Sequence, residues 1–144
     1  MHNPIRGKRK ARKLAMQALY QWLITKQNLT EIELQFCQAN NIEKIDLNYF
    51  HQLLYGVPAH LVFLETKLTP LLDRPIQELN PVESSILRLA SFELFYCPEI
   101  PFRVVLDEAI SLAKEFGSQD GHRYVNGVLN NLAKIARVQE IGAN

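Results

Sequence analysis

The residues that stand out by type and spacing are the basic ones near the start of the chain. Seven Lys and Arg residues and no Asp or Glu occupy the first thirty positions, and six of the seven lie between Arg6 and Lys13. The remaining chain has nine basic and fifteen acidic residues, so a head of charge +7 precedes a body of −6. Such a dense block of like charge repels itself unless an anionic partner lies across it. A nucleic-acid backbone is the usual partner.

Two other interpretations of the basic head exist. A short basic segment is often a solvated arm or the polar face of an ordinary helix. A membrane-surface helix would place Trp, Phe and Leu opposite its lysines along its whole length. Here the apolar residues from Leu14 to Trp22 begin only where the basic block ends, which favours a core-facing stripe and no membrane partner.

The other polar residues do not form a catalytic pattern. Asp120 and His122 are two positions apart at a predicted helix start, so their side chains face different directions, and Asp120 there is typical of a cap or a surface residue. Gly117 and Gly121 do not form a phosphate-binding glycine pattern. Cys37 and Cys97 have no metal-ligand spacing and are typical of reduced thiols in a core. The sequence predicts a binding protein with no catalytic residue, metal or cofactor.

Length and composition predict one compact unit. The chain has 144 residues, 47% of them hydrophobic, which is enough for one core. Its apolar runs are shorter than the ~20 residues of a membrane span, and no secretory signal follows the basic head. We therefore expect a cytoplasmic protein.

Apolar residues repeat every three to four positions almost throughout, which predicts an all-α fold. The predicted helices begin near Lys8, Thr30, Leu47, Asp73, Pro81, Pro101 and Ser118 to Asp120. Thr30 with Glu33, and Asn80 with Glu83, are spaced as capping boxes. Ala11, Leu14, Ala15, Ala18, Leu19 and Trp22 should face the core, whereas Arg9, Lys13 and Tyr20 lie on the opposite face.

Proline and glycine residues predict a helix bend, an internal boundary and two special backbone positions. An apolar seam from Leu47 to Leu71 predicts one long helix, bent around Leu54–Pro58 because Pro58 removes one backbone hydrogen bond. The stretch from Pro70 to Pro81 is the predicted internal boundary, dividing one domain of residues 1–144 into subdomains of roughly 1–72 and 73–144. Gly117 is expected as a left-handed helix cap, and Gly127 as a point of close backbone approach.

Two stretches resemble a known family. Residues 104–117, Val-Val-Leu-Asp-Glu-Ala-Ile-Ser-Leu-Ala-Lys-Glu-Phe-Gly, and residues 124–129, Tyr-Val-Asn-Gly-Val-Leu, are similar to the signature of the NusB family of bacterial antitermination factors. Ala18-Leu19-Tyr20-Gln21-Trp22 after a basic head is similar too. The RNA-binding domain of a bacterial rRNA cytosine methyltransferase shares this signature but precedes a large catalytic domain, and the end at Asn144 favours the stand-alone factor.

The resemblance implies an all-α NusB-like fold of about seven helices, in two packed subdomains of three to four helices. It also implies a protein that pairs with NusE, a small-subunit ribosomal protein, to hold the boxA element of nascent single-stranded RNA. The complex would join the elongating RNA polymerase and suppress termination in ribosomal RNA operons. Whether the free protein is a monomer or a homodimer stays open.

Individual site residues also come from the resemblance. Lys8, Arg9 and Arg12 resemble the arm that contacts RNA, and Asp120, Arg123 and Tyr124 resemble a second RNA-binding patch. Tyr20 and Glu83 resemble positions that face NusE. The alternatives are that Glu83 only completes its capping box and that Tyr20 packs on its own helix. At Leu71 some family members carry an aromatic residue, so a contact with RNA there is in doubt.

Two functions from different classes remain. The first is an RNA-binding antitermination factor, in which basic residues contact phosphates and Tyr124 stacks on a base. The second is a helical protein–protein adaptor whose basic head binds an acidic protein surface. A preference for boxA over a scrambled RNA would separate them.

Overall fold

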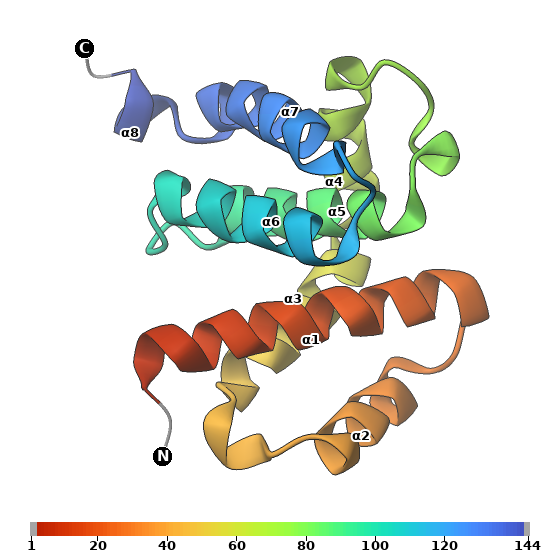
Figure 1. Ribbon diagram of the computed structural model, residues 1–144. Helices are drawn as coiled ribbons and strands as arrows, with labels where there is room; N and C mark the ends of the chain where they lie inside the picture. The colour runs from red at the N-terminus through yellow and green to blue at the C-terminus, as the bar shows by residue number, and fades with distance from the viewer. Residues whose placement is uncertain (1–2, 143–144) are drawn as a thin grey trace. The chain divides into compact units, whose positions relative to one another are not determined.

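The computed structural model describes residues 3–142, and within them the chain is entirely helical apart from turns and loops. Eight α-helices and three short 3-10 helices follow one another along this described part. They form two compact units, which we call unit 1 (residues 1–59) and unit 2 (residues 60–144) (Figure 1). The predicted all-α fold is confirmed. None of the helices in the described part is long and apolar enough to cross a membrane.

Unit 1 is built on the long helix α1 (Pro4–Thr25), which packs against α2 (Leu29–Ala39) and α3 (Leu47–Ala59). The short helix η1 (Ile42–Lys44) joins α2 to α3. Asn3 caps α1 by accepting hydrogen bonds from two backbone N–H groups, and Lys26 ends it in the left-handed conformation with φ 59°. The predicted apolar stripe of α1 is buried, except that Trp22 is half-buried.

The start of α2 differs from the prediction. Asn28 is the cap, because its side-chain oxygen accepts the Thr30 N–H at 2.8 Å. Glu33 does not complete a capping box. Its carboxylate instead lies 2.6 Å from His51 Nδ1 and accepts a hydrogen bond of 3.3 Å from the Tyr55 hydroxyl, which links α2 to α3.

The long predicted helix is interrupted. α3 ends at Ala59 and α4 (Leu61–Leu68) begins two residues later, with His60 between them at φ −116° and ψ 21°. Pro58 has no N–H for the Leu54 carbonyl, so the hydrogen-bond ladder weakens here and resumes where Leu64 N donates to His60 O. Only one residue separates the helices, which explains why the apolar phase runs on across the proline.

Unit 2 contains α4, η2 (Thr69–Leu71), η3 (Ile76–Glu78), α5 (Pro81–Tyr96), α6 (Phe102–Phe116), α7 (Gly121–Ala136) and α8 (Val138–Ile141). α5 packs against α4, α6 and α7, and α6 packs along α7 (Figure 1). The predicted start of α5 is confirmed: Asn80 accepts hydrogen bonds from the backbone N–H groups of Val82 and Glu83, and Pro81 is the first helical residue.

The boundary between the two units lies between Ala59 and His60, earlier than the predicted division near residue 72. The reason is that α4 packs against α5 and α7, and η2 packs against α7. The extended stretch from Leu72 to Pro75 is therefore an internal connection of unit 2.

Three predictions about α6 and α7 need correction. Gly117 is extended, with φ −86° and ψ −174°, so it is not a left-handed cap. A Cβ there would lie 2.7 Å from the Ala113 carbonyl oxygen, so a close approach explains the glycine. Gly127 has open space around its Cα, which removes the predicted backbone approach. The apolar repeat that begins at Val125 also predicts that Ile135 is buried, but this residue is 50% exposed.

Arg137, the residue that follows α7, links the end of this helix to the end of α5. Its buried guanidinium donates to the backbone oxygens of Leu94 at 2.7 Å, Glu93 at 3.1 Å and Cys97 at 3.0 Å. These carbonyls lie at the end of α5 and in its cap; those of Glu93 and Cys97 also accept the backbone N–H groups of Cys97 and Ile100, so the guanidinium adds to the hydrogen bonds that end the helix. The Glu140 carboxylate accepts from Arg137 at 2.6 Å and from the Phe102 N–H at 2.9 Å, so α8 is tied to the start of α6.

Candidate nucleic-acid interface

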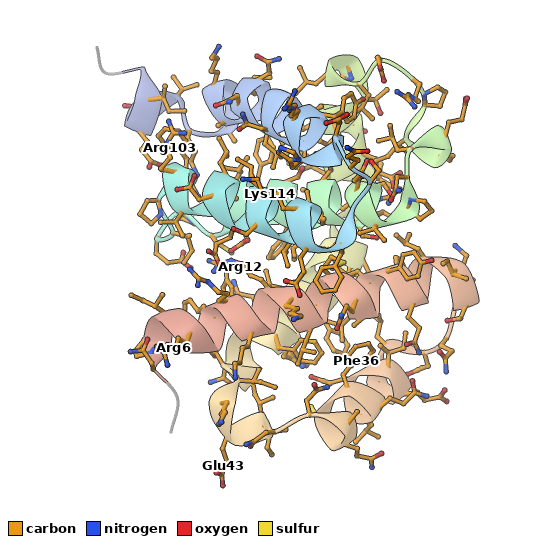
Figure 2. All side chains as sticks on the ribbon, in the orientation of Figure 1. Arg6, Arg12, Phe36, Glu43, Arg103 and Lys114 are labelled. Atoms are coloured by element: carbon orange, nitrogen blue, oxygen red, sulfur yellow. The ribbon has the colours of Figure 1, made fainter. Side chains whose placement is uncertain are left out.

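The basic arm forms the first turns of α1, and its residues differ in exposure (Figure 2). Arg6 and Arg9 are exposed and Lys8 is half-buried, whereas Arg12 is only 4% exposed. The resemblance had placed Lys8, Arg9 and Arg12 together in an arm that contacts RNA. The structure shows instead that Arg12 is part of the packed interior.

Tyr49 on α3 explains how two residues of the arm are held. Its buried ring lies under Lys8, whose Nζ is 4.8 Å from the ring centroid, and under Arg12, whose Cζ is 5.5 Å away. Cations at such distances are attracted by the electron-rich ring face. The sequence analysis did not select Tyr49, because its only signal was its place beside Phe50 of the apolar seam.

Asp46 anchors the start of the arm to α3. Its carboxylate lies 3.0 Å from Lys8 Nζ and accepts the Tyr49 N–H at 3.0 Å, as a helix cap does. Its own N–H donates to the Gly7 carbonyl at 3.2 Å. The first turn of α1 is thus fixed to α3, and the exposed Arg6 and Arg9 project from a rigid base.

The second patch lies at the start of α7. Asp120 and Arg123 are exposed and Tyr124 is half-buried. Asp120 occupies the cap position but its side chain makes no capping hydrogen bond. The interpretation of Asp120 as a side-chain cap is therefore wrong, and its carboxylate stands on the surface.

Tyr124 is held by Asp73 and Arg74, which the sequence analysis treated only as the start of a short helix. Its hydroxyl donates to Asp73 Oδ1 at 2.9 Å and accepts the Asp73 N–H at 3.2 Å. Arg74 binds the same carboxylate through two nitrogens, at 3.0 and 3.2 Å, and its Cζ lies 5.9 Å from the Tyr124 ring centroid. No sequence pattern links residues fifty-one positions apart, so this cluster appears only in the structure.

The cluster shifts the pKa values of its three members, and the hydrogen bond and charge of Asp73 raise that of the Arg74 guanidinium. Hydrogen bonds from Arg74 and then from Tyr124 lower the pKa of the Asp73 carboxyl. Burial, together with the neighbouring Asp73 charge, raises the pKa of the Tyr124 phenol. Tyr124 is therefore a neutral ring near pH 7, with its orientation set by Asp73.

Glu83 lies inside unit 2, with 7% of its surface exposed. Its Oε2 accepts the backbone N–H and the hydroxyl of Ser118, each at 2.7 Å. The capping box with Asn80 is therefore not formed, although Asn80 caps the helix itself. Glu83 fixes the turn that leads to Asp120 and Tyr124.

Tyr20 lies on α1 and is 36% exposed. Its hydroxyl has no hydrogen-bond partner among residues 3–142. An exposed ring with an unused hydroxyl is suited to a protein partner. The arm and Tyr20 belong to unit 1, whereas the Tyr124 cluster and Glu83 belong to unit 2.

A comparison with protein families shows to which family the chain belongs. A model described as the NusB family matches residues 9–134. The chain belongs to the NusB family.

Individual members agree over nearly the full length. The transcription antitermination protein NusB of Legionella pneumophila (strain Corby) is 62% identical over 137 residues, which cover 95% of this chain and 93% of that protein. NusB of T. maritima has a TM-score of 0.80 at 25% identity and covers 93% of both chains. A chain from a crystal structure of the antitermination factors NusB and NusE in complex with dsRNA has a TM-score of 0.83 at 26% identity, covering 90% of this chain and 98% of that chain.

The NusB match includes Arg9, Arg12 and Tyr20 in unit 1 and all the proposed site residues of unit 2. Within residues 3–142 no three His, Cys, Asp or Glu side chains are grouped as metal ligands. Burial and the Glu33 charge raise the pKa of the Cys37 thiol, which favours the unreactive protonated form.

Proposed function

We propose that this chain is an RNA-binding transcription antitermination factor that pairs with NusE to hold boxA RNA and support elongation through ribosomal RNA operons. The observation that carries the proposal is the match of residues 9–134 to the NusB family. The 62% identity with a named antitermination protein supports it. The solved relative that contains NusE and RNA supports the choice of partners.

The arm of α1 supplies affinity for the RNA backbone. Arg9 is exposed and contacts phosphates directly, while Lys8 and Arg12 contribute from their places over Tyr49. Contacts of this kind bind any sequence and weaken as salt rises. The arm therefore brings RNA to the protein without selecting boxA.

The start of α7 supplies contacts to bases. The Tyr124 ring can stack on an unpaired base, and Arg123 stands one position away on the exposed side of the helix. Asp120 presents an acceptor for a base amino group. We assign Tyr20 to the NusE surface, and Glu83 to the same surface or to its support through Ser118.

The proposed function includes no catalytic step and needs no cofactor. The protein acts in the cytoplasm as part of the RNA polymerase elongation complex, together with NusE. Whether it forms a homodimer when free is a question for analytical ultracentrifugation of the isolated chain.

The test is an RNA-binding assay with boxA and with a scrambled RNA of equal composition, each with and without NusE. We expect boxA to bind more tightly than the scrambled RNA, and NusE to increase the difference. Equal affinities under both conditions would overturn the proposal and favour the adaptor, whose basic head binds an acidic protein surface.

A further inference from the structure

The ion pair of Asp73 and Arg74 lies beside Tyr124, but the function described so far assigns it no contact with RNA. The two side chains are 58% and 51% exposed. Arg74 Nε and Nη2 donate to the two carboxylate oxygens at 3.0 and 3.2 Å, so the guanidinium binds the carboxylate with two parallel hydrogen bonds. Among residues 3–142 this guanidinium forms no other hydrogen bond or ion pair.

A phosphate group can take the place of this carboxylate. The planar guanidinium binds carboxylate and phosphate in the same bidentate geometry. An exposed ion pair contributes little to stability, because water already solvates both charges. A phosphate that accepts the same two hydrogen bonds therefore displaces Asp73 from Arg74 at a small cost.

The position of Arg74 fits a phosphate of bound RNA. Its Cζ lies 5.9 Å from the centroid of the Tyr124 ring, which the proposed function assigns to base stacking. Each base of an RNA strand is joined through one sugar to the phosphates on either side, so a base on Tyr124 brings phosphates close to Arg74.

The surface beside the pair leaves room for the strand. Asp73 and Arg74 line a hollow of about 440 Å³ in unit 2. The other carboxylate of its lining belongs to Glu65, whose Oε2 lies 2.9 Å from Nε of the buried Arg88. The charge of Glu65 is therefore already paired, and Asp73 is the carboxylate that competes for Arg74.

Asp73 can release Arg74 without losing Tyr124. Its Oδ1 accepts a hydrogen bond from the Tyr124 hydroxyl at 2.9 Å, and its backbone N–H donates to the same hydroxyl at 3.2 Å. Neither contact involves Arg74. The ring therefore keeps its orientation while the guanidinium changes its partner.

We propose that Arg74 is a further RNA-binding residue, and that Asp73 occupies its guanidinium until a phosphate of the RNA replaces the carboxylate. Asp73 thus lowers the affinity for RNA, because it competes with the RNA backbone for Arg74. This inference rests on the proposed function, since the ligand is the RNA whose base stacks on Tyr124.

The first test measures the affinity of the full chain with NusE for boxA at several salt concentrations. Asp73→Asn removes the competing charge but retains an acceptor oxygen for the Tyr124 hydroxyl. We expect affinity to rise by about three- to fivefold, the upper range for the loss of an exposed ion pair. The slope of log affinity against log salt should steepen by up to about 0.7, the value for one single-strand phosphate. An unchanged or lower affinity would overturn the competition.

Glu78→Gln is the matched control for the loss of a carboxylate near Arg74. The pKa of the Arg74 guanidinium is raised first by the hydrogen bond and charge of Asp73, and less by the charge of the exposed Glu78. Glu78 thus acts on Arg74 through charge alone, so Glu78→Gln should change boxA affinity by less than about twofold. A gain as large as that of Asp73→Asn would show a general effect of negative charge and overturn the proposal.

Arg74→Ala, made in the Asp73→Asn protein, tests Arg74 itself. We expect it to remove the gain in affinity and to lower the salt slope by about 0.7. Lys114→Ala in the same protein removes an exposed charge of α6 and should leave both values unchanged. If Arg74→Ala also leaves them unchanged, the inference fails while the function stands. If the wild type binds boxA no more tightly than scrambled RNA, the proposed function itself fails.

The second test identifies the phosphate. Each phosphate of boxA is replaced in turn by an uncharged methylphosphonate, and each RNA is bound to the wild type and to Arg74→Ala. We expect one replacement to weaken binding to the wild type by at least about threefold and to leave binding to Arg74→Ala unaffected. Equal losses for the two proteins at every position would overturn the contact between Arg74 and a phosphate.

Discussion

The Glu83 carboxylate holds the turn between α6 and α7 through Ser118, whose backbone N–H and hydroxyl both donate to Glu83 Oε2 at 2.7 Å. This turn carries Asp120 and leads to Tyr124. A residue that resembles a NusE-facing position is therefore also the support of a proposed RNA-binding patch. Its effects on partner and RNA can be separated.

Ser118→Ala should lower the free energy of unfolding by about 1.5–3 kcal/mol, the usual contribution of a hydrogen bond to a charged group. Glu83→Gln retains an acceptor oxygen and should cost less. If Glu83 acts only through the turn, both variants change RNA affinity and neither changes NusE affinity. Loss of NusE affinity in Glu83→Gln alone would show a direct contact with NusE. Urea denaturation and titration with NusE provide the measurements.

Two glycines of α7 should respond in opposite ways to alanine. A Cβ at Gly121 would overlap the Glu83 carboxylate, whereas one at Gly127 would meet open space. Gly121→Ala should destabilise by about 1–3 kcal/mol, and Gly127→Ala should stabilise by about 1 kcal/mol because alanine favours the helix. Thermal unfolding of the two variants checks the pair, and a stabilised Gly121→Ala would contradict the packing described here.

Arg9 and Arg12 should separate RNA binding from folding. Arg9→Ala removes an exposed charge, so stability should stay within about 0.5 kcal/mol of the wild type while the RNA salt slope falls by about 0.7. Arg12→Ala removes buried packing against Tyr49 and should cost about 1–3 kcal/mol. The comparison needs denaturation and RNA titrations at several salt concentrations. Equal stabilities of the two variants would show that Arg12 is not a packed residue.

Tyr124 and Asp120 test base recognition. Tyr124→Ala should cost about 1–3 kcal/mol of RNA binding through lost stacking, with a larger loss for boxA than for scrambled RNA. Tyr124→Phe keeps the ring and should retain most of the affinity. Asp120→Asn should strengthen binding, because it removes repulsion of phosphate, keeps an acceptor oxygen and disturbs no capping hydrogen bond. Affinities measured with NusE decide the matter, and equal losses on both RNAs for Tyr124→Ala would exclude a specific base.

Asp73 predicts a defined pH dependence of stability. Its pKa is lowered in the folded protein by Arg74 and then Tyr124, so its stabilising contribution is present above the unfolded pKa of about 3.9 and is lost as pH falls through the folded value. Asp73→Asn should therefore be less stable than the wild type at neutral pH, and the difference should shrink in acid. Urea unfolding between neutral and acidic pH measures it, and a difference independent of pH would contradict the prediction.

The sequence predicted the helices well, because helix caps and apolar repeats are formed by residues close together in the chain. Asn80 and Pro81 began α5 where expected, and the apolar repeats found most buried residues of α1 and α7. The failures have two kinds of cause. Gly117 is explained in part by Glu83, a partner distant in sequence, whereas the interruption at His60 and the cap at Asn28 depend on local backbone hydrogen bonds whose outcome the residue types did not determine.

In the candidate site, too, the sequence revealed some residues, whereas the contacts between distant residues appeared only in the structure. A run of basic residues revealed the arm, but the number of basic residues could not show that Arg12 is buried over Tyr49. The carboxylate of Asp73 and the ring of Tyr124 meet only through the packing of unit 2, so the turn at Asp73-Arg74 gave no sequence signal of its part in the patch.

The three carbonyl contacts of Arg137 have a consequence for the order of folding during synthesis. Arg137 leaves the ribosome some forty residues after the end of α5 that it caps. Until then, the carbonyls of Glu93, Leu94 and Cys97 lack the hydrogen bonds that the guanidinium adds. The nascent α5 should therefore fray at this end, and it should gain protection from hydrogen exchange only after α7 has been translated.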